Sequence, residues 1–256
     1  MLSIPRRSTF ALPLLAALPA RAETPMAAKP LSRDIAWWQK RHHDKLEELA
    51  QKKPSLIFLG DSITQDWEVD KDDKPFLQFA PGWKRFYGDR NAVNLGFNGD
   101  ATCHLLWRIE NGEVSGYTAK AAVVLIGANN LGRLHWSAAD TIAGIATCLT
   151  ALRTRQPTAK ILLLGVLPSI RSDWATETTL AINRGLAARY RDPAIATYMD
   201  VGHIFMKNGK VDPDMFIDPQ LTPPRKPLHP TPQAQNLISA AIEPTLVRML
   251  GDRTHS

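Results

Sequence analysis

One stretch of the sequence decides the fold: Leu56-Ile57-Phe58-Leu59-Gly60-Asp61-Ser62-Ile63-Thr64. A short apolar run rich in β-forming residues stops at a glycine, which is typical of a buried strand in a parallel sheet. Ser62 then stands where the strand gives way to a helix, at the edge where open α/β folds bind ligands. This stretch alone fits either a nucleophilic serine or a serine that caps the helix.

Three further segments place polar residues at comparable positions. They are Asn94-Leu95-Gly96-Phe97-Asn98-Gly99-Asp100, Val123-Val124-Leu125-Ile126-Gly127-Ala128-Asn129-Asn130 and Leu228-His229-Pro230-Thr231-Pro232. In their order and spacing, the four segments resemble the four blocks of the SGNH (also called GDSL) hydrolases. The stretch 94–167 is most similar to the catalytic subunits of the brain platelet-activating-factor acetylhydrolases. The resemblance extends from about residue 37 to about residue 246.

The resemblance implies a role for each matching residue. Ser62 would be the nucleophile and His229 the general base, because an imidazole can take the serine proton. The N–H of Gly99 and the side-chain amide of Asn129 would join the N–H of Ser62 in an oxyanion hole, which needs donors fixed in advance. The expected activity is hydrolysis of acetyl or short-chain acyl esters of small molecules, carbohydrates or lipids, with no metal or organic cofactor.

The chain departs from the family pattern at the carboxylate that orients the histidine. The family has an aspartate three residues before the histidine, where this chain has Lys226. Alignment from Gly209 puts the family aspartate on Asp218, with the proline-rich residues 219–227 as an insertion. Because a triad depends on geometry and not on sequence distance, we favour Asp218. Asp214 is the alternative, and a Ser-His pair oriented by a backbone carbonyl stays open.

Several other polar residues have structural interpretations. We expect Asp61 to bond the turn that follows the first strand. Asp100 is expected to cap the helix that begins after it. The basic and histidine-rich residues 40–44 are expected to form a solvated helix face and not a metal or polyanion site.

Length and composition indicate one α/β domain. The chain has 256 residues, of which 44% are hydrophobic, and it shows no internal repeat. Apolar strand-like runs alternate with helical patterns, which predicts a three-layer α/β/α sandwich with a five-stranded parallel sheet of flavodoxin-like architecture. The predicted strands are 55–59, 92–95, 121–126, 160–166 and 196–199. The domain is expected to span residues 23–256.

Residues 1–22 have the features of a signal peptide. Arg6 and Arg7 precede an apolar stretch at 10–18, and Ala20-Arg21-Ala22 is typical of a cleavage site. The apolar stretch is too short to span a bilayer, so we expect no stable membrane insertion. Cleavage would lower the formal net charge from +6 to +3, because three arginines and no acidic residue are removed. We therefore expect a periplasmic or secreted protein that does not bind nucleic acid. Sec or twin-arginine export and a homodimer stay open.

The sequence disfavours several other functional classes. Cys103 and Cys148 are expected to be small buried residues, although an oxidising compartment would permit a disulfide. No zinc spacing or acidic calcium loop occurs. A nucleotide binder is disfavoured because no glycine-rich phosphate motif follows the first strand, and an α/β-hydrolase because the G-x-S-x-G glycine is missing. A non-catalytic glycan- or ester-binding relative is the alternative to an esterase.

Overall fold

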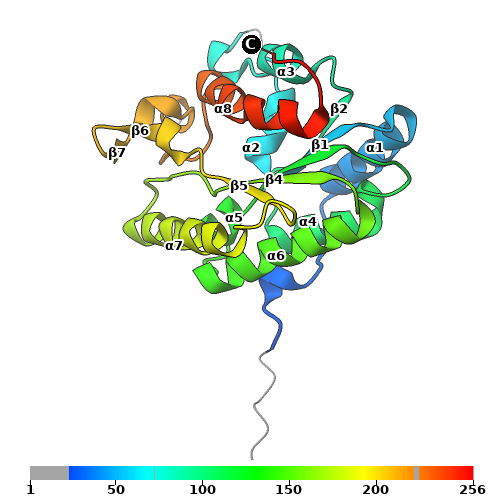
Figure 1. Ribbon diagram of the computed structural model, residues 1–256. Helices are drawn as coiled ribbons and strands as arrows, with labels where there is room; N and C mark the ends of the chain where they lie inside the picture. Colours follow the sequence, from blue (N-terminus) through cyan, green and yellow to red (C-terminus); the bar gives the residue numbers. More distant parts are fainter. Residues whose placement is uncertain (1–22, 72, 222–224, 256) are drawn as a thin grey trace, which may run out of the picture.

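The predicted fold class is confirmed by a computed structural model that describes residues 23–255, apart from 72 and 222–224. The expected signal peptide lies outside the described residues. Five parallel strands form one sheet in the order β2-β1-β3-β4-β5 (Figure 1). The strands are β1 Leu56–Gly60, β2 Ala92–Gly96, β3 Ala121–Leu125, β4 Lys160–Leu164 and β5 Thr197–Met199. Most of their ends match the predicted ends within one residue, and β4 ends two residues early.

Helices cover both faces of the sheet (Figure 1). One face packs against α1 Ala36–Lys52, α4 Thr102–Arg108, α6 Ala138–Arg155 and α7 Asp173–Arg189. The other packs against α2 Ser62–Gln65, α3 Ala80–Tyr87 and α8 Pro232–Leu250. The remaining elements are the short helix α5 Ala128–Gly132, the hairpin β6 Met206–Lys207 and β7 Lys210–Val211, a π turn at Ile109–Glu113, and 3₁₀ turns at Met26–Ala28, Asp66–Glu68, Pro75–Leu77, Gly202–Phe205, Pro213–Met215 and Asp218–Gln220.

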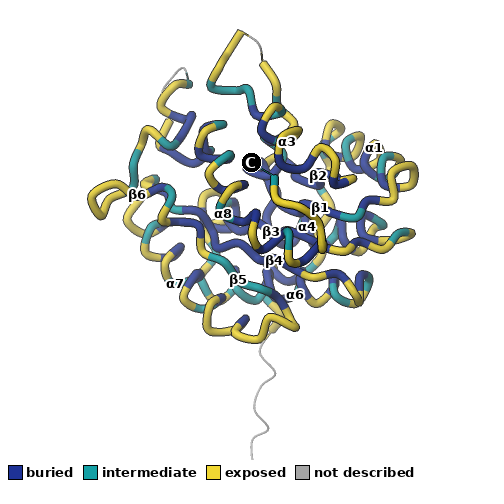
Figure 2. Tube along the Cα trace, turned by 45° about the horizontal axis from the view of Figure 1, so that its top comes forward, coloured by how far each residue is buried: buried dark blue, intermediate teal, exposed yellow. Residues whose placement is uncertain are grey.

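β1, β2 and β3 are buried along their whole length, as Figure 2 shows in dark blue, whereas the edge strand β5 is half-buried. Alternate side chains of β1 enter opposite cores: Ile57 and Leu59 pack beneath α1, α4, α6 and α7. Leu56 and Phe58 pack against α3 and α8. Each fully buried side chain of this size contributes about 1.5–3 kcal/mol to the free energy of folding. Burial on both sides explains why β1 is apolar throughout. It also holds the carboxyl ends of the strands in place, and the polar loops begin there.

The predicted solvated face at residues 40–44 is wrong at His42, which is only 7% exposed. Its Nδ1 lies 3.1 Å from Oε1 of Glu113, and its ring stacks on Trp38 with centroids 6.0 Å apart. His42 follows Trp38 by four residues, so both side chains lie on the same buried face of α1. The neighbours Lys40, His43 and Asp44 are exposed as expected.

The two cysteines are buried in the domain, as expected from the sequence. Cys103 and Cys148 are buried and both are free. Thr231 caps α8: its Oγ1 accepts a hydrogen bond of 3.1 Å from the backbone N–H of Ala234. Across residues 23–71, 73–221 and 225–255, no helix has the length and apolar character needed to cross a membrane. The same residues contain no cluster of three potential metal ligands.

Candidate active site

The turn between β1 and α2 holds Ser62 at the first position of the helix. A Cβ atom on Gly60 would lie 2.1 Å from Oγ1 of Thr64 and 2.5 Å from the carbonyl oxygen of Leu125, so only glycine fits there. Asp61 has extended backbone geometry, and its Oδ1 accepts a 2.9 Å hydrogen bond from the N–H of Ile63. Asp61 therefore bonds the turn, as the sequence predicted.

The side chains of Ser62, His229 and Asp218 form a continuous line of contacts. Oγ of Ser62 lies 3.0 Å from Nε2 of His229. Nδ1 of His229 lies 3.1 Å from Oδ1 of Asp218. Ser62 is 4% exposed and Asp218 is fully buried, whereas 22% of the His229 side chain is exposed. This arrangement places a base beside the hydroxyl and an acceptor behind the base.

Backbone pairing brings Asp218 to His229 across the insertion. Phe216 and Pro230 form an antiparallel bridge, and the N–H of Ile217 donates to the carbonyl of His229 at 2.9 Å. Oδ2 of Asp218 accepts the N–H groups of Leu228 and His229, both at 2.5 Å. The loop therefore starts and ends at adjacent points.

The alternative orienter lies elsewhere. Asp214 is exposed in the turn Pro213–Met215, and its N–H donates to Oδ1 of Asp212 at 3.0 Å. Within the described residues, the hydrogen-bond partner of His229 Nδ1 is Asp218. The geometry therefore offers Asp218, and not Asp214, to the imidazole.

The protonation of His229 is set by competing effects. Burial lowers the pKa of His229, but the bond to Asp218 and the nearby charge of Asp66 outweigh it, so the pKa lies above its ordinary value. Burial raises the pKa of Asp218, yet the bonds from His229 and Leu228 bring it below its ordinary value. An ionised Asp218 therefore stabilises a protonated His229.

Asp66 is a carboxylate that the sequence reasoning missed. Burial raises its pKa to about 7, and its charge interacts with that of His229. Its Oδ2 is buried without a hydrogen-bond partner among the described residues. Asp66 follows Ser62 by four residues, which puts both on the same side of a helical turn. That spacing was the available signal.

The expected oxyanion donors Gly99 and Asn129 lie on a loop and on α5, and hydrogen bonds connect that loop to α5 and to α2. Gly99 has a φ of +77°, a conformation that glycine adopts without strain. The N–H of Asn98 donates to Oε1 of Gln65 on α2 at 2.6 Å. Nδ2 of Asn129 donates to the carbonyl of Asp100 at 3.0 Å, which leaves its second hydrogen for another acceptor.

The prediction that Asp100 caps α4 is wrong. Ala101 occupies the cap position, and Asp100 is buried in an ion-pair network. Its Oδ2 accepts from Nε of Arg108 at 2.8 Å, and its Oδ1 accepts from Nε1 of Trp38 at 2.8 Å and from Nη1 of Arg33 at 3.1 Å. A buried carboxylate needs such partners. Arg33 and Trp38 lie more than 60 residues before Asp100 in the chain, so the sequence around Asp100 does not reveal them.

Arg108 extends this network beneath the strand ends. Its guanidinium is fully buried, pairs with Glu113, and donates to the carbonyls of Gly60 and Leu95 at 3.1 Å each. The Arg108 side chain thus joins the ends of β1 and β2 to α4. Arg108 also pairs with Asp100, the residue that directly follows Gly99.

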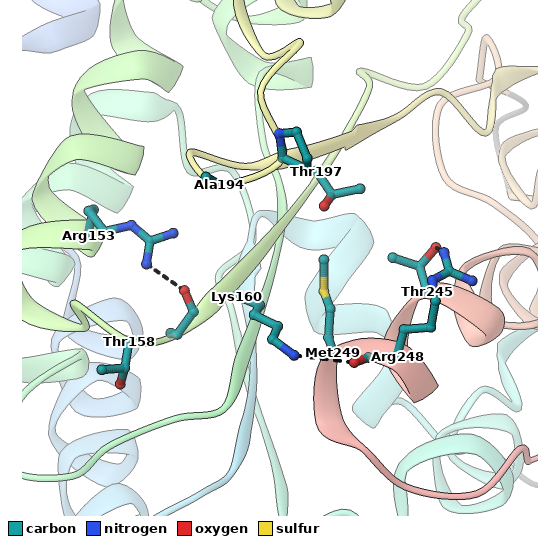
Figure 3. A pocket seen from close by; sticks show the side chains of 10 residues that line it. Arg153, Thr158, Lys160, Ala194, Thr197, Thr245, Arg248 and Met249 are labelled. Carbon is teal, nitrogen blue, oxygen red and sulfur yellow. Dashed lines mark hydrogen bonds between the residues drawn. The ribbon is translucent and has the colours of Figure 1, made fainter.

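One cavity lies beside the candidate active site and another lies at the opposite edge of the sheet. A cavity of about 20 Å³ is lined by residues that include Ala128 and Leu228, the chain neighbours of Asn129 and His229. A cavity of about 620 Å³ lies at the opposite, amino edge of the sheet, beside the start of β4 (Figure 3). Its lining includes three cationic side chains but no histidine, cysteine or serine, so it lacks the groups for acyl transfer.

Comparison with known proteins gives a family match and related sequences. The family model of the GDSL-like lipase/acylhydrolase family matches residues 58–237. The platelet-activating factor acetylhydrolase IB subunit alpha2 of Homo sapiens is 34% identical over 148 residues, which are 57% of this chain and 58% of that protein. The match thus spans little more than half the length of the curated relative.

Solved structures share the fold. A GDSL-like lipase from Bacteroides thetaiotaomicron has a TM-score of 0.60 at 18% identity, covering 82% of this chain and 97% of that chain. A carbohydrate esterase family 3 protein from Talaromyces cellulolyticus has a TM-score of 0.52 at 17% identity, covering 78% and 99%. At these identities the likeness describes the architecture alone.

Proposed function

The chain belongs to the GDSL-like lipase/acylhydrolase family, and from this premise we propose that it is a carboxylic-ester hydrolase that removes acetyl or other short acyl groups through a Ser62-bound acyl-enzyme. The observation that carries the proposal is the contact of Ser62 Oγ with His229 Nε2 at 3.0 Å, backed by Asp218 at 3.1 Å from Nδ1. A serine hydroxyl needs such a base to act as a nucleophile.

In the proposed reaction, His229 takes the proton of Ser62 as Oγ attacks the ester carbonyl carbon. The N–H groups of Ser62 and Gly99 and the Asn129 amide stabilise the negative charge on the carbonyl oxygen. The intermediate collapses, the C–O bond to the alcohol breaks, and His229 gives its proton to the leaving oxygen. Water, deprotonated by His229, then attacks the acyl-enzyme and releases the acid and the free Ser62 hydroxyl.

The names of related proteins support a short acyl group. Relatives by sequence or by fold include an acetylhydrolase and an acetyl-xylooligosaccharide esterase from Geobacillus. We propose an acetyl ester as the first substrate class to test.

We also propose that the protein is exported. The support is the sequence of residues 1–22, with Arg6-Arg7 ahead of an apolar stretch and Ala20-Arg21-Ala22 after it. Export would place the mature chain in the periplasm or outside the cell.

The experiment that tests the esterase proposal uses p-nitrophenyl acetate and the purified protein. Ser62→Ala should abolish hydrolysis while the melting temperature stays within about 2 °C of the wild type, because only one oxygen atom is removed. Ser137→Ala is a matched control, because Ser137 is an exposed cap of α6 whose hydroxyl donates to Asp140 and not to His229. If Ser62→Ala retains activity, Ser62 is not the nucleophile; if the wild type is inactive on esters, the non-catalytic alternative is favoured.

A further inference from the structure

Arg133 lies beside the expected oxyanion hole. It directly follows α5, the helix that carries Asn129, and its N–H donates to the carbonyl of Asn129 at 3.1 Å. A Cβ atom on Gly99 would lie 2.3 Å from Nη1 of Arg133. The Arg133 guanidinium therefore touches the loop whose N–H is expected to bind the carbonyl oxygen.

Two other guanidinium groups lie along the same rim. The same Cβ position on Gly99 would lie 3.2 Å from Nη1 of Arg33. A Cβ atom on Gly132 would lie 3.2 Å from Nη1 of Arg171, which also lines the small cavity beside Leu228. The three arginines come from distant parts of the chain and lie around Gly99 and around Gly132, the last residue of α5.

The carboxylates near these three arginines already have other partners. Arg33 shares Asp100 with Arg108, and Asp218 is paired with His229. Within the described residues, neither Arg133 nor Arg171 forms an ion pair or a side-chain hydrogen bond. Two guanidinium groups are thus free to bind an anion.

The surroundings make an anion favourable there. Burial lowers the pKa of Arg171, the charge of Asp218 raises it, and the charge of Arg225 lowers it, so that the pKa lies below its ordinary value, although an arginine remains charged at neutral pH. Arg171 and Arg225 repel each other, and a bound anion would relieve that repulsion. Guanidinium also matches carboxylate, sulfate and phosphate oxygens through paired N–H donors.

We propose that Arg133 and Arg171 form a subsite for an anionic group on the alcohol part of the ester. The substrate class is then a short-chain ester whose alcohol carries a carboxylate, sulfate or phosphate close to the scissile bond. This inference rests on the proposed esterase function and adds the charge of its substrate. Arg33 supports the subsite but is held by Asn98 and Asp100.

The test compares two esters of the same shape. 4-Acetoxybenzoate carries a negative charge, and 4-acetoxybenzamide is neutral, so the ratio of their kcat/KM values measures the preference for charge. We expect the wild type to prefer the anion, and Arg133→Gln and Arg171→Gln each to lower that ratio about tenfold, the size of a lost charge-assisted hydrogen bond. The preference should also weaken with added NaCl, because salt screens exposed charges.

Arg248→Gln is the matched control. It removes the same charge from the cavity at the amino edge of the sheet (Figure 3), and the ratio should stay at the wild-type value. If the wild type hydrolyses both esters with no preference, or if the ratio is the same in all four proteins, the anionic subsite is wrong while the esterase proposal stands. If neither ester is hydrolysed, the esterase proposal itself fails.

Discussion

Replacing Asp218 by asparagine changes the proton on His229 with little change of shape. Oδ2 of Asp218 accepts two backbone N–H groups at 2.5 Å each, from Leu228 and His229. An asparagine must keep its oxygen on these two donors, so its NH₂ group faces Nδ1 of His229. Nδ1 then becomes an acceptor, and the ring hydrogen moves to Nε2, which faces Ser62 at 3.0 Å. In that tautomer the imidazole cannot take the serine proton.

The expected loss is large. Presenting the wrong tautomer in a Ser-His-Asp arrangement lowers kcat by about 10⁴, which corresponds to about 5.4 kcal/mol in the activation free energy. The substitution also removes the charge at 3.1 Å that raises the pKa of His229. The residual rate should therefore rise at a lower pH than the wild-type rate does, because the pKa of His229 falls.

The assay is hydrolysis of p-nitrophenyl acetate between pH 5 and pH 9, with Asp214→Asn as the matched control. Asp214 is exposed and does not contact His229, so its variant should stay within about twofold of the wild type. A fall of less than tenfold in Asp218→Asn would refute the orienting role. A large fall in Asp214→Asn instead would mean that the loop adopts another arrangement in solution.

Three further predictions test the surroundings of the triad. Asn129→Ala should lower kcat by about 10²–10³, because it removes an expected oxyanion donor; a near-normal kcat would exclude that role. The wild-type rate should rise with pH through the pKa of His229, which is above its ordinary value. Asp66→Asn should move this rise to lower pH, because a charge that raises the pKa of His229 is lost. An unchanged pH dependence would contradict the interaction between Asp66 and His229. Arg108→Met should lower the free energy of unfolding by about 3–5 kcal/mol, because two carboxylates stay buried without their partner. Thermal melting measures it, and Lys40→Met, at an exposed ion pair, should cost less than about 1 kcal/mol.

The fold could be predicted because its signals are local. β1, β3 and β4 are mostly apolar runs with a glycine at or just after their end, and two-sided burial requires such a run. Ser62 and Asn129 follow two of these runs directly. The position of His229 ahead of a proline-led helix is equally local. These residues lie where the sequence put them because parallel strands share one carboxyl edge.

The residues that the sequence did not reveal depend on long-range contacts. Arg108 sits in an apolar helix, and nothing near it in the chain shows that it pairs with Asp100 and binds the carbonyl of Gly60. Arg133 and Arg171 are ordinary loop arginines until the fold brings them beside Gly99 and Gly132. Charge patterns along the chain are reliable only within a helix or strand, so such clusters need the structure.

The insertion shows why spacing alone was a poor guide to the orienting carboxylate. What the imidazole needs is an acceptor near Nδ1, and the bridge between Phe216 and Pro230 supplies it for any loop whose ends can meet. The entropy of closing a flexible loop grows only slowly with its length, and the prolines between Asp218 and His229 reduce the conformations lost on folding. A longer connection is thus compatible with the same contact, because the bridge and the Asp218 bonds to the backbone of His229, and not the number of residues, hold the two side chains together.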